Sequence, residues 1–297
     1  MHPLNTLTRL VATAVGLGLV VAAGGAAAQT AAPLGLKVYN APAGSFHVNA
    51  VVISGKTEAL VIDTGFTRAD ALRIAADVLD AGRTLKTILV SNADPDFYFG
   101  AETLQTLFPR AQVVATPAVR SRIESKLAAK LAFWGPKMGA NAPQRPVVPD
   151  ELKGTSLTVD GEAIELRGTA GELAHRPYVW IPSLKAIAGN IAVFGNLHVW
   201  TADTQQPGER RAWLAQLDEM QALQPALVVP GHMAAGTPLD ASAIRYTREY
   251  LLRFEVETPK AGSGAALIEA MHKAYPQAGM PLALDIGAKV AKGEMKW

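Results

Sequence analysis

Cysteine is missing from all 297 residues of this chain. Its absence excludes disulfide bonds, thiolate metal sites, cysteine nucleophiles and a cysteine-linked lipid anchor. Stability must therefore come from the apolar core, and chemistry from side chains that carry oxygen or nitrogen.

A large excess of charge of one sign is also missing, since the formal net charge is +2. So small a charge gives no broad positive field for nucleic acid, and we expect no nucleic-acid partner. After residue 28, no apolar run is long enough to cross a membrane. The sequence does not indicate an oligomeric state.

Residues 1–28 have the pattern of a secretory signal peptide. Arg9 precedes an apolar run over residues 10–21, and small residues follow up to Ala26-Ala27-Ala28. An uncleaved membrane anchor is the alternative, because the run is nearly long enough to span. We favour cleavage before Gln29, because the small residues provide a processing site. The expected product is a single domain, 29–297, in the periplasm or secreted, without a membrane attachment.

Short apolar segments alternate with amphipathic ones along the rest of the chain. Strands are predicted at 36–40, 46–54, 59–65, 87–90, 112–116, 156–159, 163–166, 178–181, 186–190 and 226–230, and helices at 68–81, 101–108, 117–133, 207–223, 240–257, 264–274 and 282–292. The first helix is expected to bury Ala71, Ile74, Ala75, Val78 and Leu79. Residues 135–149 are rich in Gly and Pro and are interpreted as a loop near the site. This order predicts two sheets packed face to face with helices outside.

The segment from Ser91 to Gly100, Ser-Asn-Ala-Asp-Pro-Asp-Phe-Tyr-Phe-Gly, is the most informative stretch. It places polar and acidic side chains between a buried strand and a helix. In α/β proteins this end of a strand commonly carries ligand or metal chemistry. A simple turn is the alternative, because Asn, Asp and Pro are common turn formers.

Polar residues also follow three later strands or loops, in Gly171-Glu172, Gly189-Asn190 and Gly231-His232. The Gly before each one allows the backbone and side chain to approach a shared centre closely. Asp63 ends an earlier strand, and we interpret it as a loop-holding residue rather than a catalytic one.

This order of elements resembles the metallo-β-lactamase fold superfamily of metal-dependent hydrolases. The resemblance extends from Val38 to His232 and beyond, and includes Asp63-Thr64-Gly65 and the closing Val229-Pro230-Gly231-His232. It implies an α/β fold, a four-layer αββα sandwich of the metallo-β-lactamase type.

The metal-binding signature of the family is altered in this chain. The pattern His-x-His-x-Asp-His reads here as Asn92-x-Asp94-x-Asp96-Phe97. A later His position carries Glu172, the bridging Asp position carries Asn190, and the last His is kept as His232. The resemblance thus implies one set of metal ligands: Asn92, Asp94, Asp96, Glu172, Asn190 and His232.

These changes alter the expected cofactor. Phe97 cannot bind a metal, and the neutral Asn190 is a poor bridge between two cations, so a dinuclear zinc centre is not expected. The oxygen-rich set suits one divalent ion, Mn²⁺, Mg²⁺ or Ca²⁺ in preference to Zn²⁺. Three converging carboxylates without a cation would repel one another, which favours either a bound metal or protonated carboxyl groups.

Two functions are compatible with this pattern. In the first, a metal-bound water hydrolyses an ester, lactone or phosphoester, Asp96 orients or deprotonates that water, and His232 is a ligand or proton shuttle. In the second, a catalytically silent member binds a small molecule or a protein partner. Asp63, His175 and His198 are further candidates for contacts around the ligands or with a small-molecule substrate.

Overall fold

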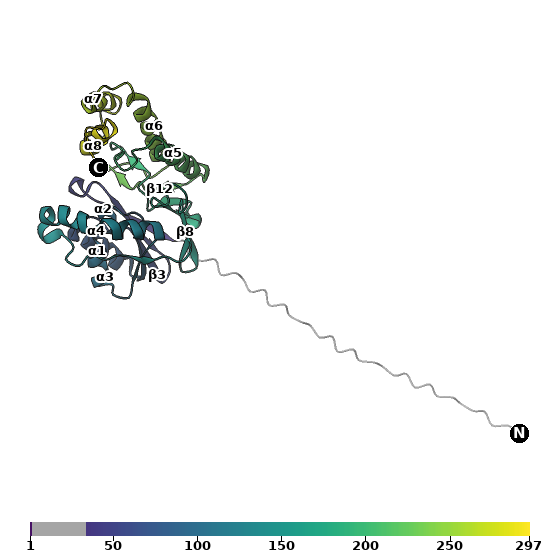
Figure 1. Cartoon of the computed structure of the whole chain (residues 1–297). Coiled ribbons are helices and arrows are strands. Elements are labelled where there is room, and N and C mark those ends of the chain that lie inside the picture. The colour runs from purple at the N-terminus through teal and green to yellow at the C-terminus, as the bar shows by residue number, and fades with distance from the viewer. Residues whose placement is uncertain (2–33) are drawn as a thin grey trace. The chain divides into compact units, whose positions relative to one another are not determined.

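The computed structural model describes Met1 and residues 34–297, and residues 34–297 belong to one compact unit (Figure 1). The predicted signal peptide lies, apart from Met1, outside the described residues. Within the described part of the chain, no helix combines the length and apolar character that a membrane crossing requires.

The first half of the domain contains a six-stranded sheet with the order β1-β2-β3-β4-β5-β6. Its strands are β1 (Gly35–Asn40), β2 (Asn49–Ser54), β3 (Glu58–Ile62), β4 (Thr84–Leu89), β5 (Gln112–Ala115) and β6 (Asp150–Glu151). The first three strands pair antiparallel, and β3 to β6 pair parallel. Its helices are α1 (Arg68–Ala81), α2 (Pro95–Tyr98), α3 (Ala101–Leu107) and α4 (Pro117–Met138).

The second half contains a five-stranded sheet with the order β12-β10-β9-β8-β7. Its strands are β7 (Ser156–Val159), β8 (Glu162–Arg167), β9 (Tyr178–Ile181), β10 (Ala186–Ala188) and β12 (Leu227–Val228). The short strands β11 (Phe194–Gly195) and β13 (His232–Met233) pair separately. The helices of this half are α5 (Pro207–Ala222), α6 (Ser242–Glu257), α7 (Gly264–Ala274) and α8 (Pro281–Ala291).

Alternation of side chains along the strands creates the layers. In β2, Val51 and Ile53 join a core cluster with residues of β8 and β9, so they fill the space between the two sheets. Their neighbours Ala50 and Val52 belong instead to a cluster with α1, α3 and α4. A third cluster packs β9 and β10 against α5 to α8. The predicted αββα sandwich is therefore confirmed, with α1–α4 and α5–α8 in separate outer layers (Figure 1).

Two details of the sequence prediction are wrong. Leu79 is 68% exposed, because it lies one residue beyond the buried Val78 and so turns away from the core stripe. The helix that begins at Pro117 continues past Phe133 to Met138, through Gly135 and Pro136. Packing explains the extension, since Trp134 contacts the rings of Phe46 and Phe66. The loop predicted over 135–149 therefore begins only after α4.

Candidate functional site

The polar loop after β4 is held in place by the buried Asp63 carboxylate. Both of its oxygens accept hydrogen bonds from Ser91, one from the backbone N–H and one from the hydroxyl, each at 2.7 Å. Burial raises the pKa of Asp63 to about 7, against the lowering effect of these hydrogen bonds. The next residue, Thr64, donates its N–H to the carbonyl of Phe97 at 2.8 Å. The end of β3 thus fixes both ends of the segment 91–97.

Asp96 and His232 lie side by side although they are far apart in the sequence. Asp96 Oδ2 lies 3.6 Å from His232 Nε2, and the two residues are only 7% and 5% exposed. Burial raises the pKa of Asp96 well above its usual range, and Asp94 adds to that effect. Burial also lowers the pKa of His232 to about 4. At neutral pH, the imidazole is therefore uncharged.

The tautomer of His232 follows from its partners. Nδ1 lies 2.9 Å from the carbonyl oxygen of Phe46, which can only accept a hydrogen bond, so Nδ1 carries the proton. Nε2 then has a free lone pair on the side facing Asp96. The ring is held between Phe194, which stacks at 5.2 Å, and Phe97, which makes an edge contact at 5.5 Å. Phe97 therefore orients the imidazole from the position at which the family signature has a metal ligand.

Asp94 is surrounded by cations of the chain itself. Its carboxylate lies 3.6 Å from Lys130 of α4, with about a quarter of its side chain exposed. Burial and the nearby Asp203 raise the pKa of Asp94, while the charges of Lys130 and Arg176 act in the opposite direction. Two cations of the chain thus offset part of the cost of a charged Asp94, although burial and Asp203 keep its pKa raised.

Arg176 is a buried cation next to this pair. It is 3% exposed, and its guanidinium carbon lies 4.2 Å from the centre of a Trp213 ring. Its Nη2 donates a weak hydrogen bond to the carbonyl of Ile191, and its Nε has no partner among the described residues. Burial lowers the pKa of Arg176 to about 10, so it stays charged at neutral pH.

The other predicted ligands do not direct their oxygens to one point. Asn92 Oδ1 accepts the N–H of Asp94, and Asn190 Oδ1 accepts the N–H of Val193. Asn190 also donates its amide N–H to the carbonyl of Val229. Glu172 is exposed and lies beside Gly208, at the first turn of α5. The two amides are therefore used by the backbone.

This donor set does not fit the single-ion site that the sequence predicts. Asp96 lies next to His232, Asp94 pairs with a lysine, and Glu172 lies at the start of α5. Within residues 34–297, no three His, Asp or Glu side chains form a group able to hold a metal ion. A divalent ion would also meet the positive charges of Lys130 and Arg176.

The remaining histidines have different surroundings. His175 is half-buried close to Arg122 and Arg176, and burial together with those charges lowers its pKa to about 4. His198 is buried in the second half of the domain, with Nδ1 3.0 Å from the hydroxyl of Tyr250. Its ring contacts are with Tyr250 of α6 and His272 of α7, and none is with Asp96 or His232 among the described residues.

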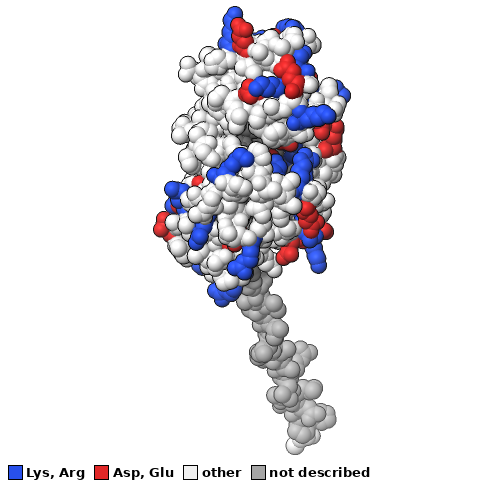
Figure 2. Space-filling model, turned by 60° about the vertical axis from the view of Figure 1, so that its left-hand side comes forward, with Lys and Arg blue, Asp and Glu red and all other residues white. Residues whose placement is uncertain are grey.

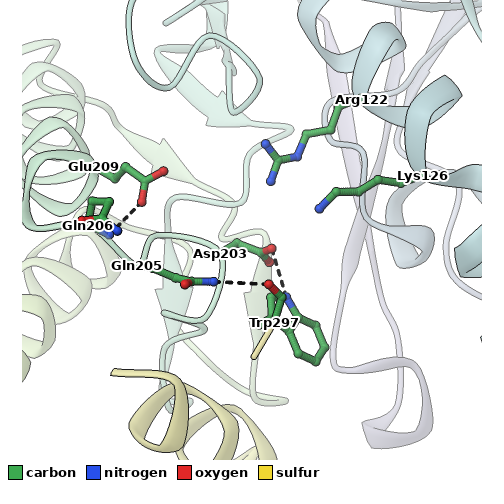
Figure 3. Close-up of a pocket in the computed structure, with 7 residues that line it drawn as sticks. All are labelled: Arg122, Lys126, Asp203, Gln205, Gln206, Glu209 and Trp297. Atoms are coloured by element: carbon green, nitrogen blue, oxygen red, sulfur yellow. Dashed lines mark hydrogen bonds between the residues drawn. The ribbon is translucent and has the colours of Figure 1, made fainter. Parts of the chain in front are cut away.

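A cavity of about 300 Å³ opens between α4 and the start of α5 (Figure 3). Its lining residues are Arg122, Lys126, Asp203, Gln205, Gln206, Glu209 and Trp297. Arg122 and Lys126 extend from α4 toward the acidic residues on the opposite wall (Figure 3). Lys130, the next residue on that helix face, lies 5.7 Å from the Trp297 ring and contacts Asp94. The cavity therefore adjoins the Asp94 side of the site.

The sequence interpretation missed the basic residues. Arg122, Lys126 and Lys130 recur every four residues in a predicted helix, and this spacing places them on one face. That signal was available. Arg176 and Asp203 carry no comparable signal, because only the fold brings them to Asp94.

Comparison with known proteins identifies the family. The model of the metallo-beta-lactamase superfamily matches residues 43–232, more than half of the chain. No curated protein matches. A metallo-beta-lactamase family protein from Thermus thermophilus is similar in structure, with a TM-score of 0.62, 17% identity, and coverage of 88% of this chain and 93% of that one.

Two further solved structures share the fold. One is a beta-lactamase domain protein from Burkholderia ambifaria, with a TM-score of 0.59, 16% identity, and coverage of 88% of this chain and 84% of that one. The other is a metallo-beta-lactamase from Pontibacter korlensis, with a TM-score of 0.52, 19% identity, and coverage of 74% of this chain and 95% of that one. At these identities the likeness shows the fold alone. The family match and the αββα layers together show that the chain belongs to the metallo-beta-lactamase superfamily.

Proposed function

We propose that this chain is an exported hydrolase of a small ester, lactone or phosphoester, with His232 as the general base. The observation that carries the proposal is the hydrogen bond from His232 Nδ1 to the carbonyl of Phe46. It leaves Nε2 as a proton acceptor, 3.6 Å from an Asp96 oxygen. Membership of a superfamily of hydrolases supports the same reaction class.

The chemistry can be written with these two side chains. A water molecule adds to the carbonyl carbon of an ester, and its proton passes to Nε2 of His232. The bond from that carbon to the alcohol oxygen then breaks, and the alcohol takes the proton back from Nε2. Asp96 orients the water and, when ionised, stabilises the imidazolium that forms between the two steps. Water is the only co-reactant: its oxygen becomes part of the acid product and its proton ends on the alcohol.

Hydrolysis of chromogenic substrates tests the proposal. Purified protein is assayed with 4-nitrophenyl acetate, 4-nitrophenyl phosphate and a lactone, with and without a chelator. Replacing His232 with Ala should lower kcat/KM by about 100-fold or more, the size of a general-base contribution. Asp96→Asn should mainly lower kcat, because it retains the shape but not the charge.

A matched histidine control is available on α7. His272 is exposed, so His272→Ala makes the same chemical change outside the site and should leave kcat/KM unchanged. Equal activity in wild type and His232→Ala would refute the assignment of the base. Export is tested separately by mass spectrometry of secreted or periplasmic material, where a chain beginning at Gln29 is expected.

A catalytically silent binding protein is the second candidate. It is favoured by the low exposure of Asp96 and His232, at 7% and 5%, which limits direct contact with a substrate. In that case no substrate would be hydrolysed, but ligands would still bind in the adjoining cavity. Binding assays and activity assays on the same preparation distinguish the two candidates.

A further inference from the structure

We propose that the cavity between α4 and the start of α5 binds the oxyanion group, phosphate or carboxylate, of a small-molecule ligand through Arg122 and Lys126. The inference names the charged group that the ligand carries. It rests on the proposed function only where it takes that ligand to be the substrate.

Arg122 and Lys126 have no direct ion-pair partner in the part of the chain that the structure describes. Both are half-buried and both line the cavity. Neither one forms an ion pair or a side-chain hydrogen bond within residues 34–297, whereas Lys130, one turn further along, is paired with Asp94. Two adjacent, partly desolvated cations repel each other, and a shared anion would relieve that repulsion.

The acidic residues of the cavity are held on the wall opposite α4 by neutral donors. Asp203 accepts indole N–H groups from Trp200 at 2.6 Å and from Trp297 at 3.1 Å. Glu209 accepts the backbone N–H of Gln206 at 2.9 Å and so closes the first turn of α5. Figure 3 shows these two acidic residues on the wall opposite α4. These neutral N–H donors fix the two carboxylates in place but leave their charge, so an anionic group would meet favourable charge on the α4 side of the cavity, at Arg122 and Lys126.

The position of the cavity connects it with the candidate site. The charge of Lys126 acts on Asp94, and the charge of Arg122 acts on His175 and Arg176. Lys and Arg side chains also border a hollow on the face shown in Figure 2. An anion held by α4 would therefore lie on the Asp94 side of the candidate site, where Lys130 links the Trp297 ring with Asp94.

The size of the cavity selects the class of ligand. At about 300 Å³, it lies at the lower end of the range for small-molecule pockets. The guanidinium of Arg122 suits two oxygens of one phosphate or carboxylate, and Lys126 adds a point charge. The side-chain amides of Gln205 and Gln206 provide neutral hydrogen bonds for the rest of the molecule.

Calorimetric titration with phenylphosphonate and with benzoate, in low salt, tests the inference without relying on catalysis. The two probes share a ring and differ in the oxyanion, so the tighter one identifies the source of the charge. Arg122→Ala and Lys126→Ala should each weaken binding about tenfold, and the double variant about 100-fold. Lys137→Ala is the matched control, because Lys137 lies on α4 and does not line the cavity. It should bind like wild type.

Failure of this inference differs from failure of the proposed function. Hydrolysis that depends on His232, with the same KM for 4-nitrophenyl phosphate in wild type and double variant, would overturn the anion site alone. The absence of hydrolysis together with binding that is lost in the double variant would leave the anion site standing. Titrations in which neither probe binds, or in which the double variant binds as tightly as wild type, overturn it.

Discussion

Asp63 should stabilise the fold through its two hydrogen bonds to Ser91, and this can be measured. The carboxylate is 1% exposed and receives both the N–H and the hydroxyl of Ser91. Asp63 also has a positive φ of 63°, a conformation that Asn tolerates and Ala adopts only with strain. Asp63→Ala therefore removes two bonds and adds strain, while Asp63→Asn keeps an acceptor and the backbone conformation.

The magnitude follows from these contacts. Leaving the buried N–H of Ser91 without a partner costs about 1–3 kcal/mol, and the left-handed backbone adds about 1 kcal/mol for Ala. Asp63→Ala should thus lower the free energy of unfolding by about 3 kcal/mol. Asp63→Asn should cost about 1 kcal/mol or less at acidic pH. Urea unfolding of the variants, followed by tryptophan fluorescence, measures both values.

The pH dependence gives an independent check. Since burial raises the pKa of Asp63 from 3.8 to about 7, the folded state holds a proton that the unfolded state loses. Wild-type stability relative to Asp63→Asn should therefore fall as the pH rises from about 4 to about 7, by at most about 4 kcal/mol. A stability difference that does not change with pH, or an Asp63→Ala variant as stable as wild type, would refute this reasoning.

Three other predictions follow from the same structure. Elemental analysis of protein purified without chelator should find less than one equivalent of divalent metal, because the predicted ligands within residues 34–297 do not converge; two equivalents of zinc would contradict this. Asp160 accepts hydrogen bonds from Thr57 and Glu58 that lower its pKa to about 2. The ionised carboxylate therefore stabilises the folded protein above pH 3.8, and this contribution is lost as the pH falls through about 2. The difference in Tm between wild type and Asp160→Asn should shrink as the pH is lowered from above 3.8 to about 2, and a constant difference would speak against it. Arg176→Met should lower the free energy of unfolding by about 2 kcal/mol in urea titrations, since it removes a buried cation stacked on Trp213; an unchanged value would contradict that contribution.

Local patterns were sufficient to predict the fold. The apolar spacing from Arg68 to Ala81 predicts a helix with the observed bounds, because a capping box at Thr67 and Asp70 and a Gly after Ala81 define its ends. Errors arise where tertiary packing overrides local signals. Gly135 and Pro136 favour an end to α4, yet the contacts of Trp134 with two phenylalanine rings keep the helix intact.

The candidate site was predictable only in part. A strand-end position indicates which residues can approach one another, and Asp96 and His232 do meet. The position of a residue at a strand end does not reveal which hydrogen bonds its side chain makes in the folded protein. Asn92 and Asn190 stand at ligand positions, but their oxygens accept backbone N–H groups. Such choices depend on loop geometry, which the spacing of residues does not encode.

Side chains at the altered ligand positions have partners within the chain itself. Asp94 lies 3.6 Å from Lys130, and the charges of Lys130 and Arg176 oppose the rise in its pKa that burial and Asp203 cause. Phe97 replaces a ligand with a ring that orients His232. The amides at the other positions hold loops through the backbone. Because these side chains have partners within the chain, we expect less than one equivalent of divalent metal, and Arg122 and Lys126 of α4 in the adjoining cavity, unpaired within residues 34–297, favour the oxyanion ligand proposed above.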